Sequence, residues 1–283
     1  METALERNPL YSVTEPRLIM EMTWPEVDAL LRQTKTIVMS IGSVEQHGPH
    51  LPLGSDYYQG DEQVRRTVAM LKERGVIVAG GFVIPFGPSE DGLSFPGTLS
   101  IRTETLQAML RDLLDSLYRH GFRYFPLIPN HEQNMAPAMS AVREFNAEHA
   151  DAVAGLLSGW FQKAVVEKRQ SVATGAQRLR DGHAGELETS RMLASRPELV
   201  QMGHAGTYYP EPLGPELPYD QYPFAGGGLY KPHHSYRSFA PDGFVGDASQ
   251  ATAAKGEQMY GDSTSWLCDV IVRDFLESHQ PHS

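Results

Sequence analysis

Apolar runs of strand type alternate with helical patterns between Thr36 and Ser195. Strands are predicted at 36–41, 76–79, 82–85, 124–128 and 152–157, and helices at 57–73, 105–120, 136–149 and 185–195. The strongest helical signal is 105–120, where leucines recur on one face at helical spacing. This alternation implies an α/β fold with a mainly parallel sheet and helices on both of its faces.

The length of 283 residues suits a single α/β domain covering 1–283. Pro126 weakens the centre of the 124–128 strand, because proline cannot donate a backbone hydrogen bond. The segment 203–246 is dense in Pro, Gly and Tyr, and it includes Gly226-Gly227-Gly228 and His233-His234. We expect an irregular excursion there, which either caps a site or forms an oligomer contact.

Composition narrows the range of partners and compartments. A formal net charge of -11 argues against non-specific binding to nucleic acid or to anionic membranes. No apolar run approaches the ~20 residues that cross a bilayer, and the first residues lack the basic start and apolar centre of a signal peptide. Cys268 is the single cysteine, so no intrachain disulfide can form. We therefore predict a cytoplasmic protein with no nucleic-acid and no membrane partner.

Polar side chains follow the predicted strands at the points where the strands end. In chain order these residues are Glu45 and His47, then Ser89, then Asn130 with His131 and Glu132, and finally His183. Ligands of open parallel sheets bind beyond the carboxyl ends of the strands. We therefore expect these side chains to converge at one edge of the sheet.

The loop from Glu45 to Asp56 is rich in Gly and Pro and presents carboxylates and imidazoles. These groups are suitable ligands for Zn²⁺, Mn²⁺ or Fe²⁺. Glu45 and His47 are two residues apart, so an extended chain would point both to the same side. Asp56 could bridge two ions roughly 3.5–4 Å apart. The absence of thiol ligands favours a catalytic site over a structural zinc site, while His50 is predicted to have a structural role.

A further cluster lies at 181–190, where His183 directly precedes a predicted helix. Glu186 and Glu188 fall in the first helical turn, two residues apart, and therefore point in different directions. We predict that Glu188 faces the site, whereas Glu186 would stabilise the helix dipole or face solvent or a partner. A lone His–Glu pair in a loop is more often a surface salt bridge. The addition of His131 and Glu188 weakens that alternative.

In several motifs, the chain resembles the creatininase (creatinine amidohydrolase) family. The matching motifs, in family order, are 43–56, 95–100, Asn130-His131 with Asn134, 183–185 with 188–190, and 243–247. The resemblance implies a three-layer α/β/α sandwich with a mostly parallel central sheet. It also implies a centre of one or two divalent metal ions, hydrolysis of an amide C–N bond, and a homo-oligomer, possibly a hexamer.

The resemblance also carries roles onto individual residues of this chain. Glu45, Asp56 and His131 would bind one ion, and His47 and Asp56 would bind the other. His183 matches the histidine that serves proton transfer. Ser89 matches a serine that contacts the substrate.

Several positions depart from the pattern of creatininase itself. Gln133 occupies the position of the glutamate that binds the second ion, which leaves Glu188 as the first candidate for that ligand and Glu132 as the second. Leu179 and Arg180 stand where a tryptophan covers creatinine, and Gly92 replaces a histidine that is common in the family. These changes predict a family member that is not a true creatininase.

We therefore predict a metal-dependent hydrolase that acts on a non-peptide C–N bond of a small amide, cyclic or N-formyl. The metal would activate a water molecule and polarise the carbonyl. His183 would protonate the leaving nitrogen, or shuttle the proton with a carboxylate such as Glu132 or Glu188. The alternative is an inactive metal-binding member that serves as a binding or assembly subunit. A nucleotide-binding oxidoreductase is excluded, because 42–48 lacks the Gly-x-Gly-x-x-Gly fingerprint.

Overall fold

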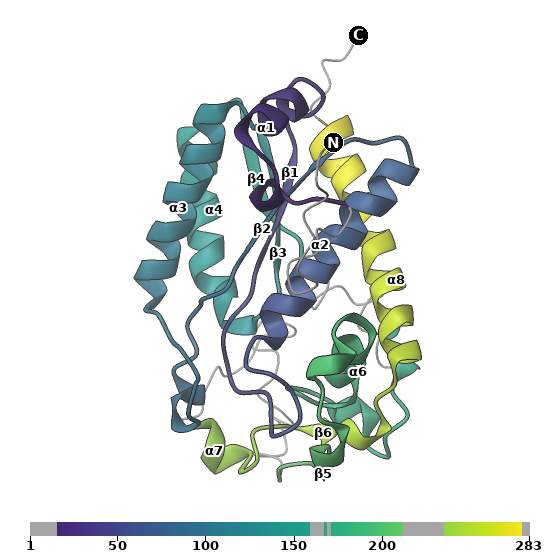
Figure 1. Ribbon diagram of the computed structural model, residues 1–283. Helices are drawn as coiled ribbons and strands as arrows, with labels where there is room; N and C mark the ends of the chain where they lie inside the picture. The colour runs from purple at the N-terminus through teal and green to yellow at the C-terminus, as the bar shows by residue number, and fades with distance from the viewer. Residues whose placement is uncertain (1–15, 159–166, 169–170, 212–234, 279–283) are drawn as a thin grey trace, which may run out of the picture.

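A computed structural model describes residues 16–158, 167–168, 171–211 and 235–278. Its central sheet has the strand order β2-β1-β3-β4, and every neighbouring pair is parallel (Figure 1). The strands are β1 Ile37–Ile41, β2 Ala79–Ile84, β3 Tyr124–Pro129 and β4 Val153–Leu156. The predicted parallel sheet is therefore confirmed.

Helices cover both faces of this sheet, which gives three layers (Figure 1). One face carries α3 Thr103–His120 and α4 Met135–Glu148, and the other carries α2 Ser55–Glu73 and α8 Ala253–Val270. Successive side chains of β1 pack against the helical layers on opposite faces of the sheet. Val38 packs in a cluster with Leu71 of α2 and Leu267 of α8, whereas Met39 packs with Leu114 of α3. The predicted three-layer α/β/α sandwich is confirmed.

The remaining elements are shorter. They are α1 Trp24–Leu31, α6 Glu186–Ser195, α7 Tyr236–Phe239, β5 Thr207–Tyr208 and β6 Gly246–Asp247. Short 3-10 turns cover η2 Ile19–Glu21, η3 Asp91–Ser94, η4 Glu132–Asn134, η6 Arg178–Arg180, η7 Pro197–Leu199, η8 Met202–His204 and η9 Ala248–Gln250, and a π-helical end, η10 Ile271–Glu277, extends α8. No helix in the described ranges is long and apolar enough to cross a membrane.

The predicted separation of two strands needs correction, whereas the strand predicted around Pro126 is present. The separate strands predicted at 76–79 and 82–85 are one strand, β2, and residues 76–78 lie outside it. Pro126 lies inside β3, between the isolated bridge from Tyr124 to Thr36, just before β1, and the pair of Leu127 with Met39 of β1. Proline has no backbone N–H to donate, and the pairing toward β1 is interrupted at Pro126. The strand continues because Pro126 still pairs with Gly155 of β4 on its other side.

The predicted excursion at 203–246 is described at 203–211 and 235–246. There β5 pairs antiparallel with β6 and brings the two ends of the excursion together. Gly226-Gly227-Gly228 and His233-His234 lie outside the described residues. The described parts contain only short elements, as the Pro and Gly content predicts.

The end of β1 packs closely against the start of α2. A Cβ atom on Gly42 would lie 2.9 Å from the backbone carbon of Asp56, so this approach requires glycine. Asn130, after β3, donates from its side-chain amide to the Asp56 carbonyl at 2.9 Å, and its backbone N–H donates to Ile41. These contacts fix Asp56 at the carboxyl edge of the sheet.

Candidate metal centre

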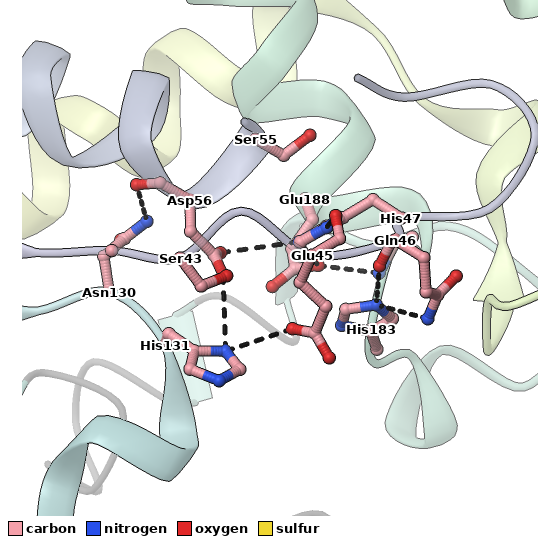
Figure 2. Close-up of polar contacts among 12 residues, drawn as sticks. Ser43, Glu45, Gln46, His47, Ser55, Asp56, Asn130, His131, His183 and Glu188 are labelled. Atoms are coloured by element: carbon pink, nitrogen blue, oxygen red, sulfur yellow. Dashed lines mark hydrogen bonds and ion pairs between the residues drawn. The ribbon is translucent and has the colours of Figure 1, made fainter. Parts of the chain in front are cut away.

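Among the described residues, three sets of potential metal ligands meet at the carboxyl edge of the sheet (Figure 2). One consists of Glu45, His47 and His183, and the other two, which we call the first and second sets, share Asp56. In the first set, Nδ1 of His131 lies 3.2 Å from Oε2 of Glu45 and 3.3 Å from Oδ2 of Asp56. In the second set, Nε2 of His47 lies 3.4 Å from Oδ1 of Asp56 and 3.9 Å from Oε2 of Glu188. Asp56 therefore turns one carboxylate oxygen to each set, which is the arrangement that a bridging ligand requires.

Hydrogen bonds orient both imidazole rings of this centre. Nδ1 of His47 lies 3.0 Å from the Glu45 carbonyl oxygen, and Nε2 of His131 lies 2.7 Å from the Pro88 carbonyl oxygen. Because a carbonyl can only accept, these two nitrogens carry the ring protons. In the neutral rings, Nε2 of His47 and Nδ1 of His131 then offer their lone pairs to the carboxylate side, as metal-binding histidines do.

The centre is buried, and its charges influence one another strongly. Burial opposes the charge on His47, but the nearby Asp56 carboxylate outweighs it and raises the pKa of His47 to about 9. In the same way, burial is outweighed at His131 by Glu45 and Asp56, which raise the pKa of that ring to about 10. The two imidazoles overcome burial at Asp56 and hold its pKa well below its usual range, whereas burial raises the pKa of Glu45. The site thus favours positive charge next to Asp56.

The polar atoms of the site fit a divalent cation. Nε2 of His47 and Oε2 of Glu45 are buried and have no hydrogen-bond partner among the described residues. Such atoms are costly unless a ligand satisfies them. Ser43 supports the centre from behind by donating from Oγ to Oδ2 of Asp56 at 2.7 Å. A mixture of imidazole nitrogen and carboxylate oxygen suits Zn²⁺ and Mn²⁺.

The turn that precedes α6 positions His183. The Asp181 carboxylate accepts hydrogen bonds from the backbone N–H groups of Glu186 and Leu187, and this caps the helix. Gly246 has φ 130°, and a Cβ there would lie 2.2 Å from Oδ1 of Asp181. The His183 carbonyl accepts from the backbone N–H of Val245 at 2.8 Å. The motif at 243–247 therefore holds the histidine turn in place.

His183 lies beside the second ligand set. Its ring centroid is 4.3 Å from that of His47. Its Nε2 lies 2.7 Å from the backbone carbonyl oxygen of Gln46 and 3.0 Å from the side-chain nitrogen of the same residue (Figure 2). One of these partners accepts and the other donates, so either tautomer of His183 is satisfied in place.

Ser89 lies behind His131 rather than against the carboxylates. Its hydroxyl is fully buried and lies 3.2 Å from Nε2 of His131, on the side of the ring away from Glu45 and Asp56. The contact that the structure gives to Ser89 therefore orients a candidate ligand. The predicted contact with substrate stays a prediction.

A sequence model of the creatininase family, described as creatinine amidohydrolase, matches residues 20–271. The chain belongs to the creatininase family. It is 29% identical over 255 residues to the mycofactocin precursor peptide peptidase of Mycobacterium ulcerans (strain Agy99), covering 89% of this chain and 86% of that protein. It is 28% identical over 265 residues to the creatinine amidohydrolase of Pseudomonas putida, covering 90% and 96%. Comparable identity to two different hydrolases agrees with a member that is not a true creatininase.

Solved structures of the family have the same fold. A creatinine amidohydrolase (creatininase) structure superposes with a TM-score of 0.73 at 25% identity, covering 93% of this chain and 99% of that one. A structure described as "Creatininase Mn" superposes with a TM-score of 0.70 at 26% identity, covering 94% and 100%. The fold of this chain is therefore that of creatininase.

The departure at Gln133 from the creatininase pattern has a structural counterpart. Gln133 donates from its side chain to Oδ1 of Asp91 at 2.7 Å and takes no part in either ligand set. Glu188 provides the carboxylate in the set with His47 and Asp56, whereas Glu132 is exposed and lies outside every ligand set among the described residues. The geometry thus places Glu188, the first candidate, beside His47 and Asp56.

Glu186 is the first residue of α6, as expected, and its side chain has several partners. Its side chain is 1% exposed and accepts hydrogen bonds from Thr174, from the N–H of Gly175 and from Nζ of Lys255 at 2.6 Å. It does not face solvent. Glu186 therefore ties the 174–175 loop and α8 to α6, while its neighbour Glu188 turns toward the ligands.

Sequence reasoning assigned no role to two residues that contact His183. Gln46 provides both partners of its Nε2 atom, and the Tyr236 ring packs against the His183 ring with centroids 5.1 Å apart. Gln46 lies inside the family motif, so its position next to Glu45 was the available signal. Tyr236 lies in the aperiodic 203–246 segment, which gave no signal for an individual side chain.

Proposed function

We propose that this chain is a metal-dependent amidohydrolase that binds two divalent ions and hydrolyses the C–N bond of a small amide, such as a cyclic amide or an N-formyl compound. The proposal rests on one observation: the two oxygens of Asp56 face two different sets of ligands, which lie on either side of it. When bound, a divalent ion supplies Lewis acidity to an amide carbonyl and to a water molecule. Zinc and manganese are the proposed ions.

The chain's own residues would bind the ions and transfer the proton. Glu45 and His131 hold one position, His47 and Glu188 hold the other, and Asp56 joins them. His183, whose Nε2 atom lies between the donor and the acceptor of Gln46, can change tautomer where it stands and can carry a proton to the leaving nitrogen. Glu132 is exposed near this edge and remains our proposed second group in that proton transfer.

A second candidate is hydrolysis of a peptide bond. The similarity to the mycofactocin precursor peptide peptidase favours it, since that relative is as close as the creatinine amidohydrolase. The non-catalytic alternative, a binding or assembly subunit, was motivated by Gln133. The position of Glu188 beside His47 weakens it, because a carboxylate is available where Gln133 cannot serve.

The test is turnover by the metal-loaded protein. Wild-type protein would be stripped with a chelator, reloaded with Zn²⁺ or Mn²⁺, and assayed against lactams, formamides, simple amides and short peptides. Asp56→Asn should abolish metal-dependent turnover, and the matched control Asp28→Asn, an exposed residue paired with Arg32 on α1, should leave it unchanged. Turnover of peptides alone would replace the small-amide proposal with the peptidase candidate. Activity that survives complete metal removal would overturn metal dependence.

Other properties predicted for the chain complete the proposal. We propose that the protein works in the cytoplasm as a homo-oligomer on a small-molecule substrate. The single cysteine and the net charge of -11 support this assignment, and the oligomer rests on family membership.

A further inference from the structure

Tyr236 is the first residue of α7 and lies next to the histidines of the metal centre. Its ring centroid is 5.1 Å from that of His183, at an angle of 66° between the planes. The His183 ring is in turn 4.3 Å from that of His47. Tyr236 is therefore separated from a candidate metal ligand by a single side chain.

The position of α7 is fixed by contacts on two sides. The Arg237 guanidinium lies 4.3 Å above the Phe95 ring, and the Tyr208 hydroxyl donates to the Phe239 carbonyl at 3.0 Å. These contacts hold the short helix against η3 (Asp91–Ser94), the turn that also borders the metal centre.

η3 lies directly on the first ligand set. A Cβ atom on Gly92 would be 3.0 Å from Oε1 of Glu45. α7, which carries Tyr236, packs on η3, and the Tyr236 ring packs against His183. The tyrosine therefore lies near the first ligand set and next to His183, with the Glu45 and Glu188 carboxylates close enough to act on it.

The Tyr236 hydroxyl is buried and has no hydrogen-bond partner among the described residues. Burial and then the carboxylates of Glu45 and Glu188 raise its pKa well above the usual value, so the phenol keeps its proton. A buried donor that lacks an acceptor destabilises the fold unless a ligand completes it. The carbonyl oxygen of an amide bound near this hydroxyl is a suitable acceptor, both when it is uncharged and when negative charge develops on it.

We propose that Tyr236 is a catalytic residue whose hydroxyl donates a hydrogen bond to the carbonyl oxygen of the bound amide as negative charge develops on that oxygen. The inference rests on the proposed hydrolytic function of the same site. No proton is transferred, since the phenol remains the donor throughout. Removal of a single donor to such an oxygen typically lowers kcat by about 100- to 1000-fold.

The experiment measures binding of acetohydroxamate, a small anionic amide analogue, to protein loaded with Co²⁺, whose visible spectrum reports on its ligands. Wild type, Tyr236→Phe and the control Tyr118→Phe would be compared. Tyr118 lies near the C-terminal end of α3, and its hydroxyl donates a hydrogen bond to Asp151. We expect Tyr236→Phe to bind Co²⁺ with unchanged affinity and acetohydroxamate at least about 10-fold more weakly, the usual effect of a lost hydrogen bond to a charged group. Tyr118→Phe should match wild type.

Equal acetohydroxamate affinity in wild type and Tyr236→Phe would overturn the proposal. So would loss of Co²⁺ from Tyr236→Phe, because the tyrosine would then support the metal site instead of the substrate. If the loaded wild type itself fails to bind acetohydroxamate, the hydrolytic function fails and the inference falls with it. On any amide that the wild type hydrolyses, Tyr236→Phe should lower kcat and leave KM nearly unchanged.

Discussion

Oδ1 of Asp56 lies 3.4 Å from Nε2 of His47, while Oδ2 of the same carboxylate faces His131 on the opposite side. The carboxylate is buried and is held by the hydroxyl of Ser43. A single side chain therefore links the set that includes His131, which follows β3, to the set that includes Glu188 of α6. This link is the structural basis of the two-ion centre that we propose.

Metal loading should release protons. In the metal-free protein the pKa values of His47 and His131 are raised to about 9 and about 10, so both rings are charged at pH 7. Metal binding requires their neutral forms. Loading at pH 7 should therefore release about two protons, measured by titration calorimetry in buffers of different ionisation enthalpy, and apparent metal affinity should rise as pH increases from 6 toward 9.

The stability of the metal-free protein should have the opposite pH dependence. Because the folded pKa values lie above the ordinary 6.5, the stabilisation from these rings is fully present below pH 6.5 and is lost as pH rises through about 9 to 10. The control His204→Gln removes an exposed histidine and should change neither result. Metal affinity that stays constant between pH 6 and 8 would contradict the assignment of both rings as ligands.

Glu188 and Glu132 should differ in their effect on metal binding. Glu188→Gln keeps an oxygen that can accept from the Ala184 N–H, so the turn is preserved while the charge beside His47 is lost. We expect affinity for one of the two ions to fall by at least about 10-fold, and Glu132→Gln to retain both ions. The measurement is metal content after dialysis against graded chelator concentrations. Similar losses in the two variants would show that the second ion is held otherwise.

Glu186, two residues before Glu188, should affect stability instead of metal binding. Glu186→Gln places an amide NH₂ among the N–H groups of Thr174 and Gly175 and weakens the buried pair with Lys255. We expect the free energy of unfolding to fall by about 3 kcal/mol in urea titrations, with metal content unchanged. Glu198→Gln, which removes an exposed partner of Arg196, should cost less than about 1 kcal/mol. A stable but metal-depleted Glu186→Gln protein would contradict this division of roles.

The sequence predicted the parts of the site that depend on short-range or strand-edge placement. Glu45, His47 and Asp56 lie in one continuous motif, and His131 follows a strand whose carboxyl end must meet the same edge of a parallel sheet. Glu186 and Glu188 were predicted to point in different directions from the helix, with Glu188 toward the site, and the structure places Glu188 beside His47. What could not be derived was that Glu186 is even more deeply buried than Glu188, because its partners Thr174 and Lys255 belong to distant segments.

Two helices and one side chain were missed for different physical reasons. α8 contains Gly256, Gly261 and many polar residues, which obscure the apolar period, although Thr252 accepts from the Lys255 N–H and marks its start. Thr23 and Glu26 form a capping box at the start of α1, and this sequence pattern could have predicted the helix. Tyr236 had no periodic context, since its placement over His183 depends on contacts of α7 with η3 and β5.

Anomalous diffraction from crystals loaded with Mn²⁺ would show directly whether two ions bind on either side of Asp56. We expect two anomalous peaks per chain, one bound by Glu45, Asp56 and His131 and the other bound by His47, Asp56 and Glu188, with Asp56 between them. Two peaks with this shared carboxylate would establish the two-ion centre. A single peak at saturating metal, or peaks that Asp56 does not contact, would contradict it.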